Sequence, residues 1–200
     1  ELSHNRPVFC SEDDFKFSLA CQIKSKYKDC DIFFEFVPEY DKNVHIDIVV
    51  RHGNKLIPIE LKYKTRESEL FYNSMNYNLK SHGAKNINCY KFLSDIHRVE
   101  TFCETDPNAA KEGYAIFLTN DIAYTKPPKK NDCIYKDFSL EIGAIKKGKM
   151  DWATKTKSKT KKGCESPIIL KGQYKIEWEE YSAFKNQKNG TFMWTCANIT

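Results

Sequence analysis

The sequence lacks the features that mark several common classes of protein. Its eight cysteines are scattered, with no CxxC pair and no tight His/Cys cluster, which argues against a zinc site and favours free thiols in a reducing cytosol. No stretch approaches the roughly 20 apolar residues that a bilayer span requires, and the amino terminus has no apolar signal core. No serine or cysteine lies in a nucleophile-elbow sequence, and there is no internal repeat. We therefore expect a cytoplasmic protein without a membrane partner.

The length of the chain and its charge indicate how many domains it forms and which partners it could attract. Two hundred residues are enough for one domain with a substantial core. The formal charge of +5 is modest, but residues 126–163 hold twelve lysines against four acids, a local +8, so the rest of the chain carries −3. Such a basic stretch can attract a polyanion through counterion release. A solvated lysine-rich loop is the simpler interpretation of this run taken alone.

Hydrophobic periodicity predicts a mixed order of helices and strands. Phe15, Leu19 and Ile23 recur at helical spacing behind Ser11, a good N-cap, and predict a first helix. Runs of β-branched, aromatic and other apolar residues predict strands bounded by turn residues. The predicted helices cover residues 11–28 and 89–104, and the predicted strands cover 31–38, 44–50, 55–64, 113–120, 168–178 and 191–197.

Three charged residues stand inside two of the most apolar runs. Asp47 is flanked by two isoleucines, and Glu60 and Lys62 are two positions apart on the next predicted strand. Residues i and i+2 point to the same side of a strand, so Glu60 and Lys62 share a face. Gly53 and Asn54 are ordinary turn residues between the two strands. A tight hairpin at this turn would bring Asp47 beside the other two.

This grouping has a chemical logic. Two carboxylates placed side by side repel each other unless a cation lies between them. Mg²⁺ takes one or two carboxylates together with waters and substrate phosphate oxygens, so Asp47 and Glu60 predict a metal site. Lys62 on the same face could orient or deprotonate a metal-bound water, or stabilise the charge that develops on a phosphate under attack. The sequence therefore predicts hydrolysis of a phosphodiester.

The arrangement resembles the PD-(D/E)xK nuclease superfamily, also called the restriction-endonuclease-like fold. The family motif is an acid in one strand, followed in the next by Glu or Asp, any residue, and Lys; Asp47 and the tripeptide Glu60, Leu61, Lys62 match it. Ile46 stands where the nominal motif has proline. The predicted elements from about 11 to 119 follow the family's αβββαβ order, so the resemblance covers a little over half the chain.

The resemblance implies a mixed α/β (α+β) fold whose central mixed sheet is flanked by helices. Residues 1–125 would form the nuclease-like core. Residues 126–200 would add the lysine-rich segment and a C-terminal β-containing extension to the same domain. The fold would serve a metal-dependent nuclease acting on nucleic acid, with DNA expected rather than RNA. Bacterial restriction, phage defence and repair are all compatible, and cutting both strands would call for a homodimer.

The resemblance also assigns roles to residues. Asp47, Glu60 and the backbone carbonyl of Leu61 would bind Mg²⁺, with Mn²⁺ as a substitute, and Lys62 would position the attacking water. Many members add an acid from the first helix to the metal shell. Glu12 is the best match because it shares a helical face with Phe15, and Asp13 and Asp14 are alternatives. The expected nucleic-acid contacts are Lys64, Arg66, Lys155, Lys157, Lys159, Lys161 and Lys162.

Simpler interpretations stay open at this point. Asp47, Glu60 and Lys62 could form a cross-strand ion pair on the wet face of an ordinary hairpin. The chain could be a catalytically inactive nuclease-fold module that binds nucleic acid, or an interaction protein of an unrelated mixed fold. Asp95 and Arg98, three apart on the second predicted helix, are expected to pair on its surface. The three tryptophans are expected to pack in the core rather than stack on bases.

Overall fold

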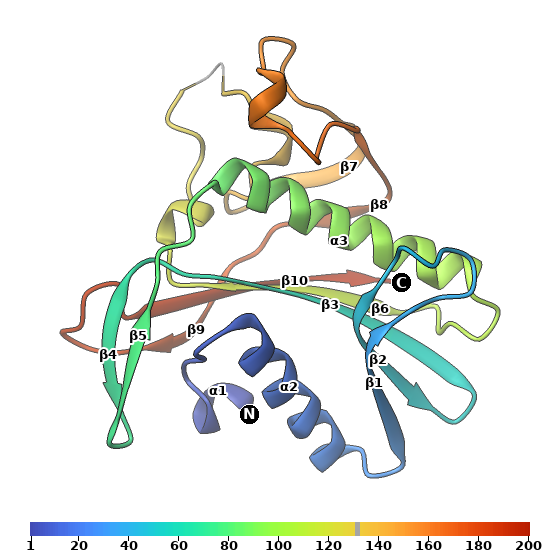
Figure 1. Cartoon of the computed structure of the whole chain (residues 1–200), viewed down its shortest axis with the longest axis horizontal. Helices are drawn as coiled ribbons and strands as arrows, with labels where there is room; N and C mark the ends of the chain where they lie inside the picture. Colours follow the sequence, from blue (N-terminus) through green and yellow to red (C-terminus); the bar gives the residue numbers. More distant parts are fainter. Residues whose placement is uncertain (131–132) are drawn as a thin grey trace.

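The computed structural model describes residues 1–130 and 133–200 (Figure 1). Its helices are α1 (Leu2–Asn5), α2 (Glu12–Lys26) and α3 (Lys85–Thr105), with short 3-10 turns η1 (Ile122–Thr125), η2 (Lys136–Phe138) and η3 (Ser158–Thr160). Its strands are β1 (Cys30–Phe36), β2 (Ile46–His52), β3 (Lys55–Lys64), β4 (Ser68–Tyr72), β5 (Met75–Leu79), β6 (Gly113–Thr119), β7 (Ile145–Met150), β8 (Ile168–Lys175), β9 (Glu179–Ala183) and β10 (Thr191–Ile199).

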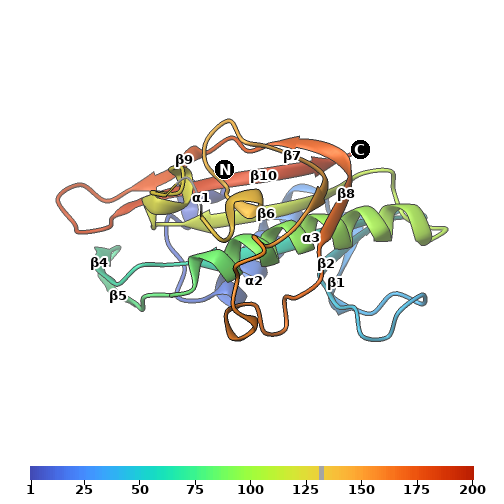
Figure 2. The ribbon, with the colours of Figure 1, turned by 90° about the horizontal axis from the view of Figure 1, so that it is seen from above.

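A six-stranded mixed sheet in the order β1-β2-β3-β6-β10-β9 organises the chain. Strands β1, β2 and β3 are antiparallel neighbours, β3 runs parallel to β6, and β10 is antiparallel to both β6 and β9. Helices α2 and α3 cover opposite faces of this sheet (Figure 1), and α3 runs along the direction of β10 when seen from above (Figure 2). The predicted mixed α/β class, with a central mixed sheet flanked by helices, is confirmed.

Local sequence explains how the elements near the site begin. The Ser11 hydroxyl accepts the backbone N–H of Asp14 at 3.0 Å, the expected N-cap of α2. Three acids follow in the first turn, where the helix dipole favours negative charge. Strands β2 and β3 pair up to His52 and Lys55, so only two residues form the turn between them. Gly53 takes a φ of 60° there, which a glycine adopts without strain.

Alternate side chains of β3 point to opposite faces of the sheet, and the two faces have different surroundings. Ile59, Leu61 and Tyr63 belong to a buried cluster that includes Phe9 and Phe15 of the α2 side. On the other face, Glu60 and Lys62 point toward α3, whose own buried residues pack with the carboxyl-terminal part of the chain. Trp152 and Trp178 are buried in that second cluster, as expected, and Trp194 is partly buried. All eight cysteines are free thiols.

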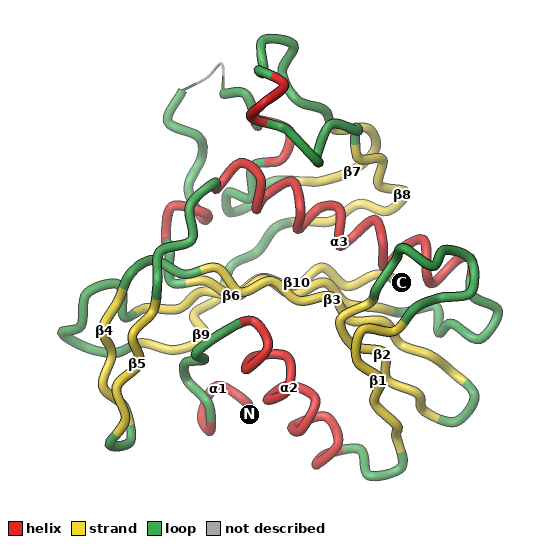
Figure 3. Tube along the Cα trace, in the orientation of Figure 1, coloured by secondary structure: helices red, strands yellow, loops and turns green. Residues whose placement is uncertain are grey.

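Several elements differ from the sequence-based prediction. Helix α3 begins at Lys85 rather than 89, and β8 ends at Lys175 rather than 178. The β4–β5 hairpin, β7 and the edge strand β9 were not predicted, because their polar residues hide the strand signal (Figure 3). Asn73 and Ser74, both at positive φ, form the β4–β5 turn and are the local clue to that hairpin. In the described part of the chain, no helix has the length and apolar character needed to cross a membrane.

Candidate active site

Asp47 and Glu60 meet where β2 and β3 separate. The ladder between the two strands ends at the pair Ile48 and Ile59, so Asp47 and Glu60 are the next residues on each strand. The Asp47 carboxylate fills the opening, and its Oδ2 atom accepts the backbone N–H of Leu61 at 2.8 Å. The two carboxyl groups are close enough for each to shift the pKa of the other. The tight hairpin thus brings together the two acids that the sequence placed in adjacent strands.

The pKa values of the two carboxyl groups are shifted in opposite directions. Burial raises the pKa of Glu60 well above its usual range, and the negative charges of Asp95 and Asp47 add to this against the opposing effect of Arg98. Burial also raises the pKa of Asp47, but its hydrogen bonds with Glu60 and the Leu61 N–H and the charge of Lys16 outweigh that effect, so the net pKa is lowered. The surroundings therefore favour the protonated form of Glu60 and the charged form of Asp47.

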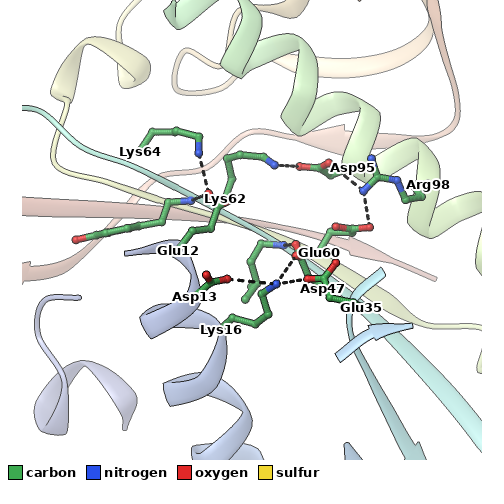
Figure 4. Close-up of polar contacts among 12 residues, drawn as sticks. Glu12, Asp13, Lys16, Glu35, Asp47, Glu60, Lys62, Lys64, Asp95 and Arg98 are labelled. Carbon is green, nitrogen blue, oxygen red and sulfur yellow. Dashed lines mark hydrogen bonds and ion pairs between the residues drawn. The ribbon is translucent and has the colours of Figure 1, made fainter. Parts of the chain in front are cut away.

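Helix α3 contributes two charged residues that contact the motif (Figure 4). Arg98 Nη1 lies 2.7 Å from Oε1 of Glu60, whose side chain is 2% exposed. Asp95 Oδ2 lies 2.9 Å from Nζ of Lys62, and Asp95 Oδ1 lies 3.5 Å from Arg98 Nη1. The expected pairing of Asp95 with Arg98 is present, but its expected surface location is wrong. Asp95 is buried because α3 packs onto the sheet with this face.

Lys62 is held as an ammonium ion by its surroundings. Burial lowers its pKa, but the carboxylates of Asp95 and Glu12 outweigh burial, and the net pKa is raised. Its side chain is only 12% exposed, and the Asp95 carboxylate fixes the position of its ammonium group. The position of Asp95 on the apolar stripe of the helix, between Phe92 and Val99, is the sequence signal that could have identified it.

Lys16 of α2 also enters the site, and sequence reasoning missed it. Its Nζ atom lies 3.1 Å from Oδ1 of Asp47 and 3.6 Å from Oδ1 of Asp13, and it forms an ion pair with Glu35 of β1. Burial lowers the pKa of Lys16, but Glu35 and Asp47 outweigh it and raise the net value. The available signal was the helix period, since Lys16 follows Glu12 by four residues on the face that packs on the sheet.

The acids of the first helix turn take separate roles. Glu12 Oε2 accepts the backbone N–H of Tyr63 at 2.6 Å and lies 2.8 Å from Lys64 Nζ. Among the described residues, the hydrogen-bond and ion-pair partners of Glu12 are Tyr63 and Lys64, not the residues around Asp47. Asp13 is mostly exposed, and Asp14 pairs with Arg6 instead. Glu12 as a metal ligand stays a prediction.

The predicted nucleic-acid contacts divide into two groups. Lys64 is the last residue of β3, and Arg66 lies in the loop beyond it. Lys64 pairs with Glu12, and Arg66 Nη1 lies 3.5 Å from Oδ1 of Asp121. The second group surrounds η3, in what we call the lysine loop (residues 155–162), and lies on the side of α3 away from the central sheet (Figure 1). Its predicted contacts are Lys155, Lys157, Lys159 and Lys162, which are exposed, and Lys161, which is half-buried.

The chemistry of the paired acids suits a hard divalent cation. Among the described residues, no three His, Cys, Asp or Glu side chains are grouped so that they could hold a metal ion. Asp47 and Glu60 offer two carboxylates, the number that Mg²⁺ uses alongside waters and phosphate oxygens. A cation between them would replace the proton on Glu60. The residues present therefore fit Mg²⁺ or Mn²⁺ bound together with substrate.

Comparison of the chain with protein-family models, with curated proteins and with solved structures yields no match. The inference of function therefore depends on the geometry of the site.

Proposed function

We propose that the protein is a metal-dependent nuclease of the PD-(D/E)xK type. Apart from the β4–β5 hairpin inserted between β3 and α3, the elements α2, β1, β2, β3, α3 and β6 follow the αβββαβ order of the restriction-endonuclease-like fold, which supports the resemblance noted in the sequence. The antiparallel run of β1, β2 and β3, followed by β6 parallel to β3, gives a connected four-strand core for that order. Strands β9 and β10 extend the same sheet from the 126–200 region.

The single observation that carries the proposal is the burial of an acid and a lysine, Glu60 and Lys62, on the β3 strand beside Asp47. Asp47 and Glu60 are the next residues on their strands beyond the last paired residues, Ile48 and Ile59, and Lys62 follows Glu60 on the same face. An ordinary hairpin would leave such residues on a wet surface, whereas Glu60 is 2% exposed and Lys62 is 12% exposed. Burial of this set is costly, and a functional site explains why the sequence retains it.

Each residue of the site has its own role in the proposed reaction. Asp47, Glu60 and the Leu61 carbonyl would hold Mg²⁺, which when bound supplies Lewis-acid polarisation of the phosphate and a more acidic water. Lys62 acts as a cation rather than as a base, because Asp95 keeps it protonated. It orients the attacking water or stabilises the negative charge that grows on the phosphate. Arg98 balances the charge of Glu60 once that carboxyl loses its proton.

The substrate class follows from the resemblance and from charge. DNA is proposed over RNA, and a homodimer would supply two sites for a double-strand cut. Lys64 ends the motif strand, Arg66 lies in the loop that leads to the β4–β5 hairpin, and both would contact phosphates near the site. The lysine loop lies farther away, so it would add a sequence-independent attraction for the polyanion.

The test is cleavage of labelled double-stranded DNA, single-stranded DNA and RNA in Mg²⁺, Mn²⁺ or EDTA. Wild type is compared with Asp47→Asn and Lys62→Ala, and Asp31→Asn is the matched control because Asp31 is an exposed strand aspartate paired with Arg51. We expect metal-dependent cutting that both site variants lose and the control retains. Cutting that persists in EDTA or in both site variants would contradict the proposal.

A second function, binding of nucleic acid without catalysis, is favoured by one observation. Lys16 and Arg98 already lie against Asp47 and Glu60, so both acids have positive partners without a metal. A binding module of this kind would show salt-sensitive binding that survives chelation. No cutting by any form, with binding retained in EDTA, would select this second function over the first.

A further inference from the structure

Lys16 is a buried lysine with three acidic neighbours. Its side chain is 8% exposed, and its ammonium contacts Asp47, Glu35 and Asp13. A buried ammonium group is retained only when it is paired, so these carboxylates account for its position. The three partners differ in burial: the side chain of Asp47 is 19% exposed, that of Glu35 is 56% exposed and that of Asp13 is 74% exposed.

Glu35 holds Lys16 from the edge of the sheet. The pairs Phe34 with Ile48 and Phe36 with Ile46 leave Glu35 level with Asp47 across β1 and β2. Glu35 has a φ of 49°, in the left-handed region that residues other than glycine rarely adopt. Its carboxylate reaches Lys16 from the edge strand, on the opposite side of Asp47 from Glu60 (Figure 4).

Both oxygens of Asp47 have partners in this arrangement. Oδ2 accepts the Leu61 N–H, and Oδ1 faces the Lys16 ammonium. A divalent cation at Oδ1 of Asp47 would lie beside the Lys16 ammonium, which is 3.1 Å from the same oxygen, and the repulsion between the two positive charges makes them compete for it. Glu35 and Asp13 lie outside the proposed pair of metal-binding acids, so Lys16 can leave Asp47 without becoming an unpaired buried charge.

We propose that Lys16 competes with the divalent cation for Asp47, and that Glu35 is the alternative partner that holds Lys16 when the metal binds. This inference rests on the proposed function, because it concerns the metal of that site. It makes Lys16 and Glu35 positioning residues that set the metal affinity. Loss of Lys16 and loss of Glu35 should then change the metal affinity in opposite directions.

Removal of the competitor should strengthen metal binding. Lys16→Met keeps the length and the apolar stem of the side chain and removes its charge, so Oδ1 of Asp47 becomes available. We expect the Kd for Mn²⁺ to fall at least 10-fold. Glu35→Gln weakens the alternative partner and leaves Lys16 more firmly on Asp47, so we expect the Kd to rise about 3-fold to 5-fold.

The experiment is titration of the intact, metal-free chain with Mn²⁺ in the absence of nucleic acid, followed by electron paramagnetic resonance and calorimetry. Lys26→Met is the matched control, because Lys26 lies on the same helix with a side chain that is 54% exposed. Circular dichroism checks that each variant is folded. Should Lys16→Met fail to fold, Lys16→Gln removes the charge while keeping a hydrogen-bond donor for Asp47.

The outcomes separate the two proposals. Tighter binding in Lys16→Met with weaker binding in Glu35→Gln supports the competition. An unchanged or weaker affinity in Lys16→Met overturns it, while Mn²⁺ binding that Asp47→Asn abolishes would leave the proposed nuclease site intact. Absence of Mn²⁺ binding in both wild type and Lys16→Met at millimolar metal would overturn the competition, whereas the proposed nuclease function would fall only if metal-dependent cleavage were also absent.

Discussion

Lys62 and Asp95 form a buried ion pair between β3 and α3, with 2.9 Å between Nζ and Oδ2. Neither side chain is more than 12% exposed, and Arg98 lies 3.5 Å from the other Asp95 oxygen. The pair joins the motif strand to a helix that follows it by more than twenty residues. Asp95 is therefore a positioning residue for the lysine of the proposed site.

Asp95→Asn should both destabilise the protein and reduce cleavage. The change leaves Lys62 buried without its negative partner, and loss of one member of a buried pair typically costs about 3 kcal/mol of unfolding free energy. We expect a cleavage rate at least 10-fold lower, because the lysine is no longer fixed as a cation. Urea unfolding and single-turnover cleavage measure the two effects.

A double-mutant cycle provides the control. Lys62→Met combined with Asp95→Asn removes both charges, so the double variant should lose less stability than the sum of the single losses. Additive losses would show that the two residues do not act as a pair. The cycle also separates folding from function, since the double variant should stay inactive while it regains stability.

Glu60 should make the metal-free protein less stable as the pH rises. Burial raises its folded-state pKa above the ordinary 4.5, so above about pH 4.5 the unfolded chain releases this proton while the folded chain keeps it. The free energy of unfolding then falls with pH until the folded-state pKa is reached. Glu60→Gln cannot ionise, so its stability should exceed that of wild type by a margin that grows with pH.

The measurement is urea unfolding of wild type and Glu60→Gln between pH 5 and pH 8 in EDTA. Added Mg²⁺ should reduce the difference for wild type only, since the cation compensates the ionised carboxyl. Parallel stability curves for the two proteins across this range would contradict the assignment of the proton to Glu60.

The sequence was sufficient to predict the acids and the lysine of the motif. Asp47, Glu60 and Lys62 stand out because charged residues interrupt apolar strands, and the two-residue turn fixes how the strands pair. The period of two along β3 assigns Glu60 and Lys62 to one face without knowledge of the rest of the fold. Local rules of this kind also located α2 and the strands of the core.

The partners of the motif could not be predicted in the same way. Lys16, Glu35 and Arg98 reach the site from three separate elements, and their contacts depend on how α2, β1 and α3 pack on the sheet. A helix surface pair and a buried ion network have the same i,i+3 spacing, so spacing alone assigned Asp95 and Arg98 to the surface. Burial decides between them, and burial is a property of the tertiary structure.

Glu100 should stabilise the protein without affecting catalysis. Its carboxylate accepts the backbone N–H groups of Lys171 and Gly172, where the β7–β8 register shifts, and the hydroxyl of Tyr174 at 2.7 Å. Glu100→Gln replaces one acceptor oxygen with an amide donor that faces these donors. We expect a loss of about 2 kcal/mol of unfolding free energy, with unchanged metal affinity.

The pH dependence gives Glu100 a separate signature. Burial raises its pKa, but the nearby His97 ring and the hydrogen bonds from Gly172 and Tyr174 outweigh burial and lower the net value below 4.5. Its stabilising effect is therefore present above about pH 4.5 and is lost as the pH falls through the folded-state value. Unfolding experiments should show the gap between wild type and Glu100→Gln closing in acid. A gap that is constant with pH would rule out the charged carboxylate as its cause.

Neutralising the lysine loop should weaken substrate binding while leaving the chemical step intact. The variant carries Lys157→Gln, Lys159→Gln, Lys161→Gln and Lys162→Gln. Each DNA phosphate that the loop no longer neutralises should lower the slope of log K against log salt by up to about 0.9. The loop lies on the far side of α3 from the sheet, so the single-turnover rate at saturating DNA should stay within about 2-fold of wild type (Figure 1).

Lys64→Gln is the comparison for the loop variant, because Lys64 lies two residues beyond Lys62 on β3 and pairs with Glu12. It removes one charge beside the site, so it should lower the single-turnover rate as well as the affinity. Fluorescence anisotropy across a salt series and rapid-quench cleavage measure the two quantities. If the loop variant keeps the full salt slope, the loop lysines are solvated charges that do not touch the substrate. If it loses the single-turnover rate, the substrate must cross α3 to reach Asp47, and the loop belongs to the active site.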